Sequence, residues 1–352
     1  MKALTFHGQH QIRFEDTPDP RIESPDDVIV KVKLCAICGS DLHVYHEYEK
    51  GLDRGTPMGH EFMGEIVDSG KNVKGFKKGD LVLSPFSVSC GRCFYCKIGL
   101  SSRCVLSQLF GWVNSGHGLM GAQAQYVRVP MAESTLMNVP RGISDEEGLL
   151  LGDIIPTGYF CAKQAEIKPG DTHVAVGCGP VGLMSIIGAI QLGSEKIYAI
   201  DTVRERLDMA EKLGAIPVDA SKTDIVELIL EATENRGADA VMEAVGSQSA
   251  GRLAYELVRP GGIISMVGVC NDQFMAFSPT DAYNKNLTFK VGRCPARSLM
   301  DTLIPIVQAH KYDFAAIITH RLSLAQGEMG YDIFANKKDN CLKVVFDQNL
   351  QN

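Results

Sequence analysis

The sequence lacks a run of apolar residues long enough to cross a bilayer, and it lacks an excess of positive charge. A membrane span takes about 20 consecutive apolar residues, and charged or polar residues interrupt every apolar stretch before that length. The opening MKALTFHGQHQIRFED meets charge before the core of a signal peptide could form. Lys and Arg number 35 against 42 Asp and Glu, which gives a formal net charge of -7 at pH 7. These absences argue against membrane and nucleic-acid partners and predict a cytoplasmic protein.

The pattern expected of a disulfide framework is also missing. Of the 11 cysteines, four crowd into residues 90–104, and the other seven are scattered along the chain. An odd, scattered remainder suits metal ligands and reduced thiols better than paired disulfides. The sequence shows no internal repeat or low-complexity tract, and its 352 residues suggest about two domains.

Two patterns of secondary structure follow one another along the chain. Strand-like runs such as KALTF, QIRFED and VIVKVKL, the last with clear period-2 alternation, predict a barrel-like β domain over residues 1–154. Strands then alternate with helices over residues 155–292, which predicts a doubly wound parallel sheet covered on both faces. Residues 293–352 are expected to return to the first domain. The predicted fold class is therefore α/β, with a doubly wound domain beside a β-barrel domain.

A dinucleotide-binding motif lies at GCGPVG, after the strand-like THVAV and before the helical LMSIIGAIQLG. Its first glycine permits a tight turn, its second lets the backbone approach a pyrophosphate, and its third lets helix and strand pack closely. An ordinary strand-to-helix turn is the alternative. The predicted cofactor contacts in this motif are Gly177, Gly179, Pro180, Val181 and Gly182.

Asp201 ends the next strand-like run, KIYAID, where a carboxylate can bind both ribose hydroxyls of an adenosine. It would repel a 2'-phosphate, which favours NAD over NADP, although the nearby Arg204 and Arg206 weaken this inference. A helix N-cap is the alternative role for Asp201. Glycines that follow later strands are expected at the same edge of the sheet, namely Gly246 and Gly268, with Glu243 beside them.

Two groups of residues have the chemistry of zinc ligands. Residues 90–104, CGRCFYCKIGLSSRC, place four thiols at C-x2-C-x2-C-x7-C spacing, which closes a tetrahedral shell and leaves no open position. A catalytic zinc instead needs three protein ligands and one open position. Cys38 and His60 are candidates, and Asp153 lies among apolar residues where an unpaired carboxylate would be costly to bury. Taken singly, these three residues could equally be a buried thiol, a core histidine and a helix cap.

The whole pattern resembles the zinc-dependent medium-chain alcohol dehydrogenase family, in particular its formaldehyde dehydrogenase-like and bacterial secondary-alcohol branches. The strings that carry the resemblance are GHEFMGEIVDSGKNVKGFKKGDLV, the four-cysteine lobe, GCGPVG and ITHRLSL. The resemblance implies a GroES-like catalytic domain and a Rossmann NAD-binding domain with two zinc ions per chain. The implied catalytic-zinc ligands are Cys38, His60 and Asp153, with Glu61 as an inner-sphere or exchange ligand; the implied structural-zinc ligands are Cys90, Cys93, Cys96 and Cys104.

The resemblance also implies roles around the reacting centre. Ser40 corresponds to the hydroxyl that touches the reacting oxygen, His43 to the surface end of a proton relay, and Thr157 to a residue beside the nicotinamide. Arg206 is expected at the cofactor site. The expected activity is reversible hydride transfer between a primary or secondary alcohol and NAD, giving an aldehyde or ketone. The alternatives are a formaldehyde dehydrogenase or dismutase-like activity, a polyol dehydrogenase, and a non-catalytic NAD-binding protein.

The substrate and the assembly are less closely defined by the sequence. The walls of the substrate pocket are expected from Trp112 and other residues of the 105–120 loop, from Leu119 or Met120, and from Cys294 and its neighbours. The expected partners are a small alcohol, aldehyde or ketone and further copies of the chain. A homotetramer is expected, with a dimer as the alternative.

Overall fold

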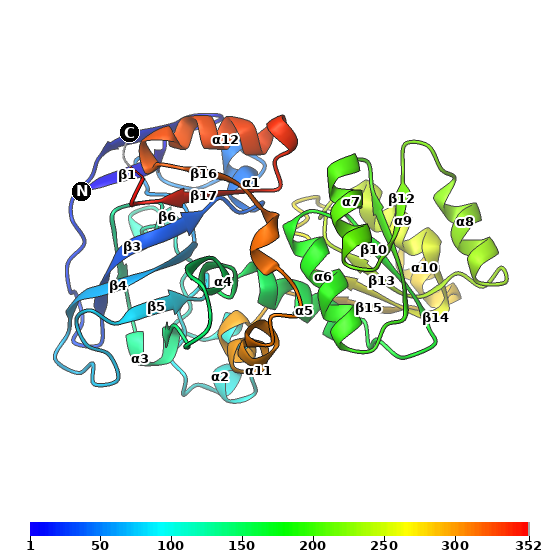
Figure 1. Cartoon of the computed structure of the whole chain (residues 1–352), viewed down its shortest axis with the longest axis horizontal. Helices are drawn as coiled ribbons and strands as arrows, with labels where there is room; N and C mark the ends of the chain where they lie inside the picture. The colour runs from blue at the N-terminus through cyan, green and yellow to red at the C-terminus, as the bar shows by residue number, and fades with distance from the viewer. Residues whose placement is uncertain (351–352) are drawn as a thin grey trace. The chain divides into compact units, whose positions relative to one another are not determined.

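The computed structural model describes residues 1–350, which fold into two compact units (Figure 1). The first unit combines Met1–Asp153 with Pro295–Asn352, and the second comprises Ile154–Cys294. The chain therefore leaves the first unit, builds the second and returns to complete the first.

The first unit is built on a sheet with the strand order β16-β17-β3-β4-β5-β9, and β8 also pairs with β3. All of these pairs are antiparallel except the parallel pair β16 and β17. Two hairpins, β1-β2 and β6-β7, stand outside this sheet. The strand bounds are β1 (Lys2–Phe6), β2 (Ile12–Asp16), β3 (Val28–Ala36), β4 (Glu61–Ser69), β5 (Leu81–Ser84), β6 (Trp112–Asn114), β7 (His117–Leu119), β8 (Tyr126–Val129), β9 (Met137–Asn138), β16 (Ile318–Leu322) and β17 (Lys343–Asp347).

Alternating hydrophobicity explains the central strand β3. Val28, Val30 and Val32 are buried, whereas Lys31 between them is exposed, as expected when successive side chains point to opposite faces of a sheet. The valines pack with Phe62 of β4 in the core of this unit. The strands predicted in the first 34 residues are confirmed.

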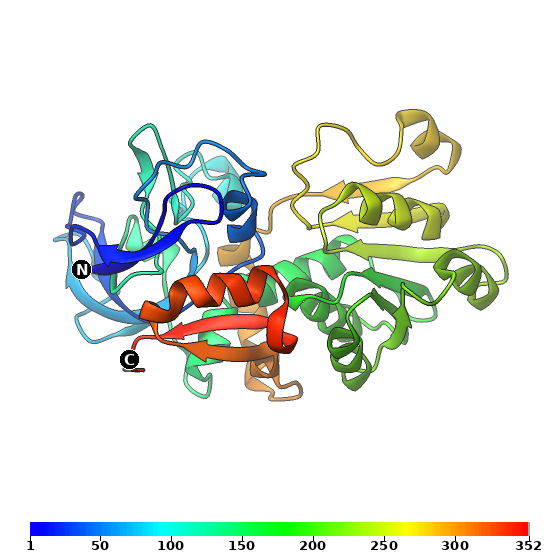
Figure 2. The same cartoon turned by 90° about the horizontal axis from the view of Figure 1, so that it is seen from above.

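Short helices connect and cover the strands of the first unit. Their bounds are α1 (Asp41–Tyr45), α2 (Phe94–Lys97), α3 (Ala132–Thr135), α4 (Asp145–Leu150), α11 (Ala296–Gln308) and α12 (Gly327–Ala335), with 3-10 turns η1 (Ser101–Arg103), η2 (Phe314–Ile317), η3 (Leu324–Gln326) and η4 (Lys338–Asn340). Helix α4 begins with a capping box in which Ser144 and Glu147 bond each other's backbone N–H groups. Helix α12 lies alongside β16 and β17 (Figure 2).

The second unit is a six-stranded parallel sheet with the order β12-β11-β10-β13-β14-β15. Its strands are β10 (Thr172–Val176), β11 (Lys196–Asp201), β12 (Ile216–Asp219), β13 (Ala238–Glu243), β14 (Val258–Met266) and β15 (Thr288–Val291), and its helices are α5 (Ile154–Gln164), α6 (Pro180–Gln191), α7 (Arg204–Lys212), α8 (Ile225–Ala232), α9 (Gln248–Leu257) and α10 (Pro279–Asn284). Helices lie on both faces of the sheet (Figure 2). The predicted doubly wound sheet is confirmed.

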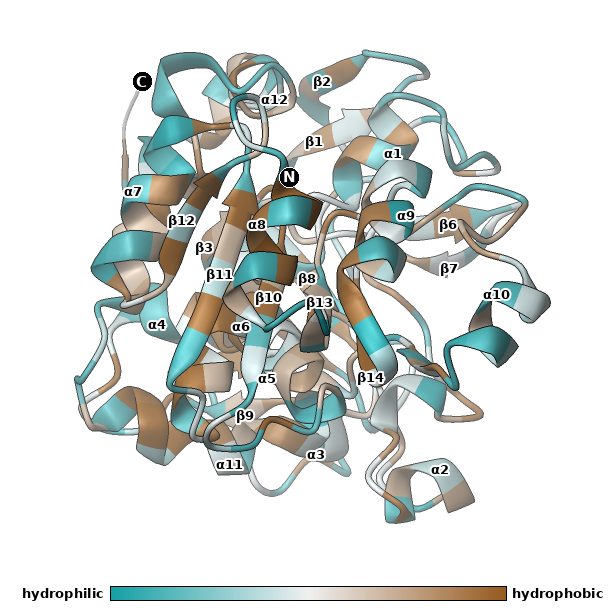
Figure 3. Ribbon diagram, turned by 90° about the vertical axis from the view of Figure 1, so that its right-hand side faces the viewer, coloured by the Kyte–Doolittle hydropathy of each residue, from teal (hydrophilic) through white to brown (hydrophobic). Residues whose placement is uncertain are grey.

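The strand order of the second unit indicates where a ligand would bind. The order reverses between β10 and β13, and ligands of such sheets bind at this switch point, outside the carboxyl ends of the strands. Strand β10 is buried along its whole length, as expected for a strand covered on both faces. Figure 3 shows that β11 is mostly hydrophobic, with hydrophilic residues at its ends.

Across residues 1–350, no helix has both the length and the hydropathy that a bilayer crossing requires.

Candidate metal and cofactor sites

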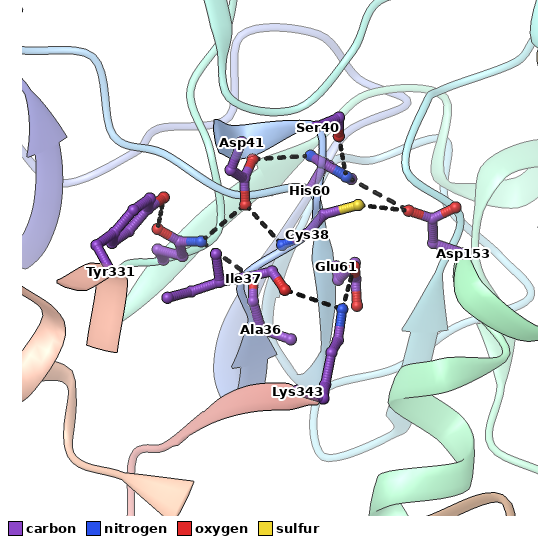
Figure 4. Close-up of polar contacts among 11 residues, drawn as sticks. Ala36, Ile37, Cys38, Ser40, Asp41, His60, Glu61, Asp153, Tyr331 and Lys343 are labelled. Carbon is purple, nitrogen blue, oxygen red and sulfur yellow. Dashed lines mark hydrogen bonds and ion pairs between the residues drawn. The ribbon is translucent and has the colours of Figure 1, made fainter. Parts of the chain in front are cut away.

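Two neighbouring strands of the first unit bring together one group of candidate metal ligands. Ala36 of β3 is paired with Glu61 of β4, so Cys38, just beyond β3, lies near His60, just before β4. Asp153 approaches from the segment that precedes α5. The ligand atoms of Cys38, His60, Glu61 and Asp153 all lie within 4.8 Å of one another (Figure 4). The structure thus brings together all four residues predicted for this site.

The spacing of these donor atoms fits a tetrahedral zinc ion. Bond lengths of about 2.0 to 2.3 Å place neighbouring ligand atoms about 3.3 to 3.8 Å apart. The Asp153 Oδ2 atom lies 3.6 Å from Cys38 Sγ and 3.4 Å from His60 Nε2. Glu61 Oε2 is buried and has no hydrogen-bond partner within residues 1–350. A thiolate, an imidazole and carboxylates are the donors that zinc uses, so the residues fit this ion.

Electrostatics in this cluster also favour a cation. Burial raises the pKa of Cys38, and the carboxylates of Asp153 and Glu61 raise it further. Burial disfavours the charged form of His60, yet Asp41 and Cys38 hold the pKa of His60 well above its usual value. Cys38, Glu61 and Asp153 therefore disfavour one another's negatively charged forms in this buried cluster. A divalent cation would reverse that preference, because it stabilises the thiolate and the carboxylates together.

A second layer of residues orients these ligands. Asp41 Oδ1 lies 3.3 Å from His60 Nδ1, which leaves Nε2 directed toward Asp153. Asp41 Oδ2 accepts hydrogen bonds from the Cys38 backbone N–H at 3.0 Å and from Gln123 Nε2 at 3.2 Å. Gln123 Oε1 in turn accepts from the Tyr331 hydroxyl at 2.8 Å. Such partners fix the tautomer and the orientation of a ligating histidine.

Sequence reasoning missed most of this second layer. Asp41 stands within CAICGSDLH, beside Cys38, and its role could have been inferred from that proximity. Gln123, Tyr331 and Lys343 have no local signal, because they meet the site only through long-range contacts. Lys343 Nζ lies 2.5 Å from Glu61 Oε1 and donates to the Ile37 carbonyl at 2.9 Å. Burial disfavours its charge, but Glu61 holds the pKa of Lys343 above its usual value.

Ser40 and His43 lie on the segment that follows Cys38. Ser40 precedes the first residue of α1, and its Oγ is 3.4 Å from His60 Nε2, so its hydroxyl borders the ligand cluster. His43 belongs to α1 and is partly buried. Burial lowers the pKa of His43, which keeps its imidazole neutral at pH 7.

The four cysteines of residues 90–104 form the second candidate metal site. Their sulfur atoms lie within 4.8 Å of one another, and the Sγ atoms of Cys93 and Cys96 are 3.6 Å apart. The four thiols are reduced. Backbone N–H groups of Cys96 and Val105 lower the pKa of Cys93 to about 6, whereas burial raises the pKa of Cys96 to about 12 and also raises that of Cys104. Four thiolate donors and no open position fit a structural zinc ion.

The glycine motif of the second unit forms the turn between β10 and α6. Gly177 has φ of 88°, a left-handed conformation that favours glycine. A Cβ on Gly182 would lie 1.8 Å from the Gly177 carbonyl oxygen, so this close helix–strand contact requires glycine. Gly179 is the N-cap of α6, and Pro180 begins the helix. The turn leaves the N-terminus of α6 able to bind a phosphate group.

Asp201 lies at the end of β11 beside this turn. Its Oδ2 accepts the Cys178 backbone N–H at 2.8 Å, and Arg206 Nη1 is 3.7 Å from the same oxygen. Its Oδ1 accepts the N–H groups of Thr202 and Val203. Each carboxylate oxygen can accept two hydrogen bonds; Oδ1 already accepts two and Oδ2 one, so Asp201 retains capacity for one ribose hydroxyl. The structure therefore fits the adenosine half of a dinucleotide here.

The other predicted residues are distributed over both units. Gly246 and Gly268 follow β13 and β14, where the Gly268 N–H donates to the Glu243 carbonyl, and Val181 and Thr157 lie in α6 and α5. Among the expected pocket walls, Trp112 and Leu119 are paired across the β6-β7 hairpin and Met120 is exposed next to it. Cys294 is buried at the end of the second unit.

Comparisons with known proteins agree with this combination of units. Residues 24–141 match the family described as "Alcohol dehydrogenase GroES-like domain", and residues 180–309 match "Zinc-binding dehydrogenase". Zinc-type alcohol dehydrogenase B of Aspergillus flavus is 40% identical over 98% of this chain and 81% of its own length. Alcohol dehydrogenase TADH from Thermus sp. ATN1 has a TM-score of 0.93 and 36% identity, with 99% of each chain covered. The 2R,3R-butanediol dehydrogenase from Bacillus subtilis has a TM-score of 0.84 and 28% identity, also with 99% of each chain covered.

A GroES-like unit joined to a dinucleotide-binding unit, with zinc-ligand clusters in the former, defines a zinc-dependent dehydrogenase. The chain belongs to the zinc-dependent medium-chain alcohol dehydrogenase family and is an alcohol oxidoreductase. The predicted family, fold class and enzyme class are confirmed.

Proposed function

We propose that this enzyme interconverts an alcohol and its aldehyde or ketone with NAD, using a zinc ion held by Cys38, His60 and Asp153. The observation that supports this most directly is the spacing of 3.6 and 3.4 Å between Asp153 Oδ2 and the other two donors, which matches a tetrahedral shell. Glu61 serves as an exchange ligand, since its Oε2 is buried beside the cluster without a partner within residues 1–350. A second, structural zinc ion belongs to the four-cysteine lobe.

The residues around the cluster have separate roles in this proposal. Zinc, when bound, supplies a Lewis acid that acidifies an alcohol and polarises a carbonyl. Ser40 borders the ligands; its hydroxyl accepts the proton of the alcohol as it gives up its own proton toward His43. His43 passes this proton to water, because its lowered pKa keeps the imidazole neutral and able to accept. Asp41 holds His60 in one tautomer.

NAD is the proposed cofactor rather than NADP. The carboxylate of Asp201 would repel a 2'-phosphate, and Arg206 is paired with that carboxylate and so is less available to a phosphate. The pyrophosphate is proposed to bind at the N-terminus of α6, with Thr157 on the nicotinamide side. The proposed contacts are Gly177, Gly179, Pro180, Val181, Gly182, Asp201, Arg206, Thr157, Gly246 and Gly268.

Secondary alcohols and diols are the first substrates to test. The structural likeness to a butanediol dehydrogenase extends over 99% of both chains, which supports this substrate class. Trp112, Leu119, Met120 and Cys294 are proposed to line the substrate pocket.

The enzyme is proposed to act as a cytoplasmic homotetramer. Support for an assembly comes from the four-cysteine lobe, where large apolar side chains are exposed. Clustered exposed apolar side chains commonly mark protein interfaces. The exposed side chains are Phe94 (69%) and Ile98 (58%) of the lobe and Val105 (68%) and Leu106 (51%) directly after it. Light scattering after size-exclusion chromatography measures the number of chains directly.

Zinc content and turnover together test the proposed function. The wild type should contain about two zinc ions per chain and oxidise alcohols with NAD. Cys38→Ser and Asp153→Asn should each lose turnover and the catalytic zinc while they retain NAD binding. Cys35→Ser, a neighbouring buried thiol on β3, is the matched control and should keep both metals. Activity retained in Cys38→Ser or Asp153→Asn, or zinc bound only by the lobe in the wild type, would contradict the ligand set.

A further inference from the structure

Gln123 connects the segments of the first unit that carry the proposed ligands of the catalytic zinc. Its Nε2 donates to the Ala36 carbonyl at 3.0 Å and to Asp41 Oδ2 at 3.2 Å, and Ala36 ends β3 just before Cys38. Its backbone N–H donates to the Met58 carbonyl at 2.8 Å, on the segment that leads into β4. Gln123 is 0% exposed, so these hydrogen bonds form in the interior of the unit.

The side chain of Gln123 also packs against the backbone next to His60. Gly59 has φ of 88°, a left-handed conformation that favours glycine. A Cβ on Gly59 would lie 2.4 Å from Gln123 Cγ and 2.9 Å from its Nε2, so a larger residue would displace the amide. The Gly59 carbonyl accepts the Ala122 N–H at 2.9 Å. The glycine therefore leaves room for this amide beside the histidine ligand.

Only one orientation of the Gln123 amide satisfies its neighbours. The Ala36 carbonyl and Asp41 Oδ2 both accept hydrogen bonds, so the amide nitrogen must face them. The amide oxygen then faces the Tyr331 hydroxyl, which donates to Gln123 Oε1 at 2.8 Å. Burial raises the pKa of Tyr331 well above its usual value, so the hydroxyl keeps the proton that it donates. Without this hydroxyl the buried amide oxygen would lose its donor, which costs free energy.

Asp41 is the residue that this arrangement holds in place. Its Oδ2 accepts hydrogen bonds from the Gln123 amide and from the Cys38 backbone N–H, while its Oδ1 lies 3.3 Å from His60 Nδ1 (Figure 4). Because two donors hold Oδ2, the carboxylate cannot rotate away from the imidazole without breaking both hydrogen bonds. Side chains in such buried networks depend strongly on one another. A change at Tyr331 is therefore expected to reach His60 through Gln123 and Asp41.

The ring and the hydroxyl of Tyr331 have separate contacts. The ring packs on Tyr45, with the two ring centroids 5.3 Å apart, and Tyr45 is the last residue of α1. The hydroxyl instead donates to Gln123. Removal of the oxygen alone therefore tests the hydrogen-bonded chain and leaves the ring packing in place.

We propose that Gln123 and Tyr331 are positioning residues for the catalytic zinc site: Tyr331 orients Gln123, and Gln123 fixes the carboxylate that directs the His60 imidazole toward the metal. The proposal rests on the proposed zinc ligands Cys38, His60 and Asp153. Loss of a residue that orients a metal ligand weakens metal binding by roughly 10- to 100-fold. Tyr331 acts through two further side chains, so we expect an effect of about tenfold, at the lower end of this range.

Release of zinc from the loaded enzyme to an excess of the chelator pyridylazoresorcinol tests the proposal. Tyr331→Phe should release the catalytic zinc about tenfold faster than the wild type, while release from the four-cysteine lobe stays unchanged. The Asp153→Asn and Cys93→Ser variants, which should each lack one of the two ions, identify which kinetic phase belongs to which site. Tyr45→Phe is the matched control, because it makes the same one-atom deletion on the neighbouring ring, and both of its release rates should equal those of the wild type.

Two results would overturn the positioning role. Equal release of the catalytic zinc from the wild type and from Tyr331→Phe would show that the hydroxyl does not act on the site. Equal acceleration of both phases in Tyr331→Phe would indicate a general loss of stability, because the lobe lies outside this chain of hydrogen bonds.

A double-mutant cycle tests whether Tyr331 acts through Gln123. Gln123→Met keeps the length of the side chain and removes both polar atoms, so it should release the catalytic zinc faster than Tyr331→Phe does. Addition of Tyr331→Phe to Gln123→Met should cause no further acceleration, because the acceptor of the hydroxyl is already gone. Additive effects would overturn the route through Gln123. If Gln123→Met does not fold, the comparison of Tyr331→Phe with Tyr45→Phe still decides the role of the hydroxyl.

The zinc content of the wild type separates this proposal from the proposed function. Zinc held by the lobe alone would contradict the proposed ligand set, and with it the role of both positioning residues. Two zinc sites filled, with release unchanged in Tyr331→Phe, would overturn the positioning role alone.

Discussion

Lys343 Nζ lies 2.5 Å from Glu61 Oε1, and the two side chains are 1% and 0% exposed. They come from β17 and β4, the two strands that flank β3 in the sheet. The Ile37 carbonyl accepts a second hydrogen bond from Lys343 at 2.9 Å. This lysine therefore anchors one oxygen of Glu61 while the other remains beside Cys38, His60 and Asp153 (Figure 4).

Removal of the lysine charge should destabilise the first unit. Lys343→Met leaves a buried carboxylate without its cation, which costs roughly 3–5 kcal/mol in comparable buried pairs. Urea unfolding of the zinc-loaded enzyme measures the change. Lys338→Met is the matched control, because Lys338 pairs with Asp332 at the surface and such pairs contribute about 1 kcal/mol or less. Equal losses in the two variants would show that the buried pair has no special contribution.

Substitution of one lobe cysteine should lower the stability of the protein and leave its catalytic rate largely unchanged. Cys93→Ser removes a ligand from a closed site, so we expect about one zinc ion fewer per chain and a lower Tm, because structural metal binding contributes folding free energy. Protein that remains folded should keep most of its kcat. Cys270→Ser, outside the lobe, should change neither metal content nor Tm appreciably. A folded Cys93→Ser enzyme without turnover would count against a purely structural role.

Cofactor preference should depend on the charge of Asp201. Asp201→Asn keeps an oxygen for the Cys178 N–H but removes the negative charge, so kcat/KM should fall with NAD and rise with NADP. We expect the ratio of the two to move by roughly tenfold or more, as for other changes of a buried polar contact. Addition of Arg206→Ala should abolish the gain with NADP. An unchanged ratio in Asp201→Asn would mean that this carboxylate does not face the ribose.

The pH profile of alcohol oxidation should report on His43. The neutral imidazole accepts the proton, and burial lowers the pKa of His43, so its contribution is fully present at pH 7. That contribution should be lost only as the pH falls below the usual histidine value of about 6.5. His43→Gln should slow oxidation by about tenfold or more and remove this acidic limb, whereas His117→Gln, at an exposed position at the start of β7, should do neither. A limb that persists in His43→Gln would belong to another group.

Local patterns in the sequence were sufficient for much of the fold. Alternation in VIVKVKL predicts β3, and GCGPVG between an apolar strand and an apolar helix predicts the turn from β10 to α6, because these preferences act within a few residues. Cys38, His60 and Asp153 came from short motifs and the family resemblance, and the structure places their donor atoms together.

Most of the second layer of residues that orients these ligands could not be predicted from local sequence patterns. Lys343 is 282 positions from Glu61, and Tyr331 is 208 positions from Gln123. Such pairs depend on which strands become neighbours and in which register. Lys343 begins the otherwise largely apolar strand β17. A lysine buried there needs a negatively charged partner, but the sequence does not identify that partner.

The position of β17 between β16 and β3 has a consequence for biosynthesis. Residues 154–294 can complete their own sheet as soon as they leave the ribosome, since all strands of that sheet lie within this range, and domains generally fold as units during synthesis. The first unit emerges earlier but lacks Lys343, and with it the cation beside Glu61, until nearly the whole chain has been translated. Cys38, His60 and Glu61 therefore lack this neighbouring cation until the last strand has been synthesised.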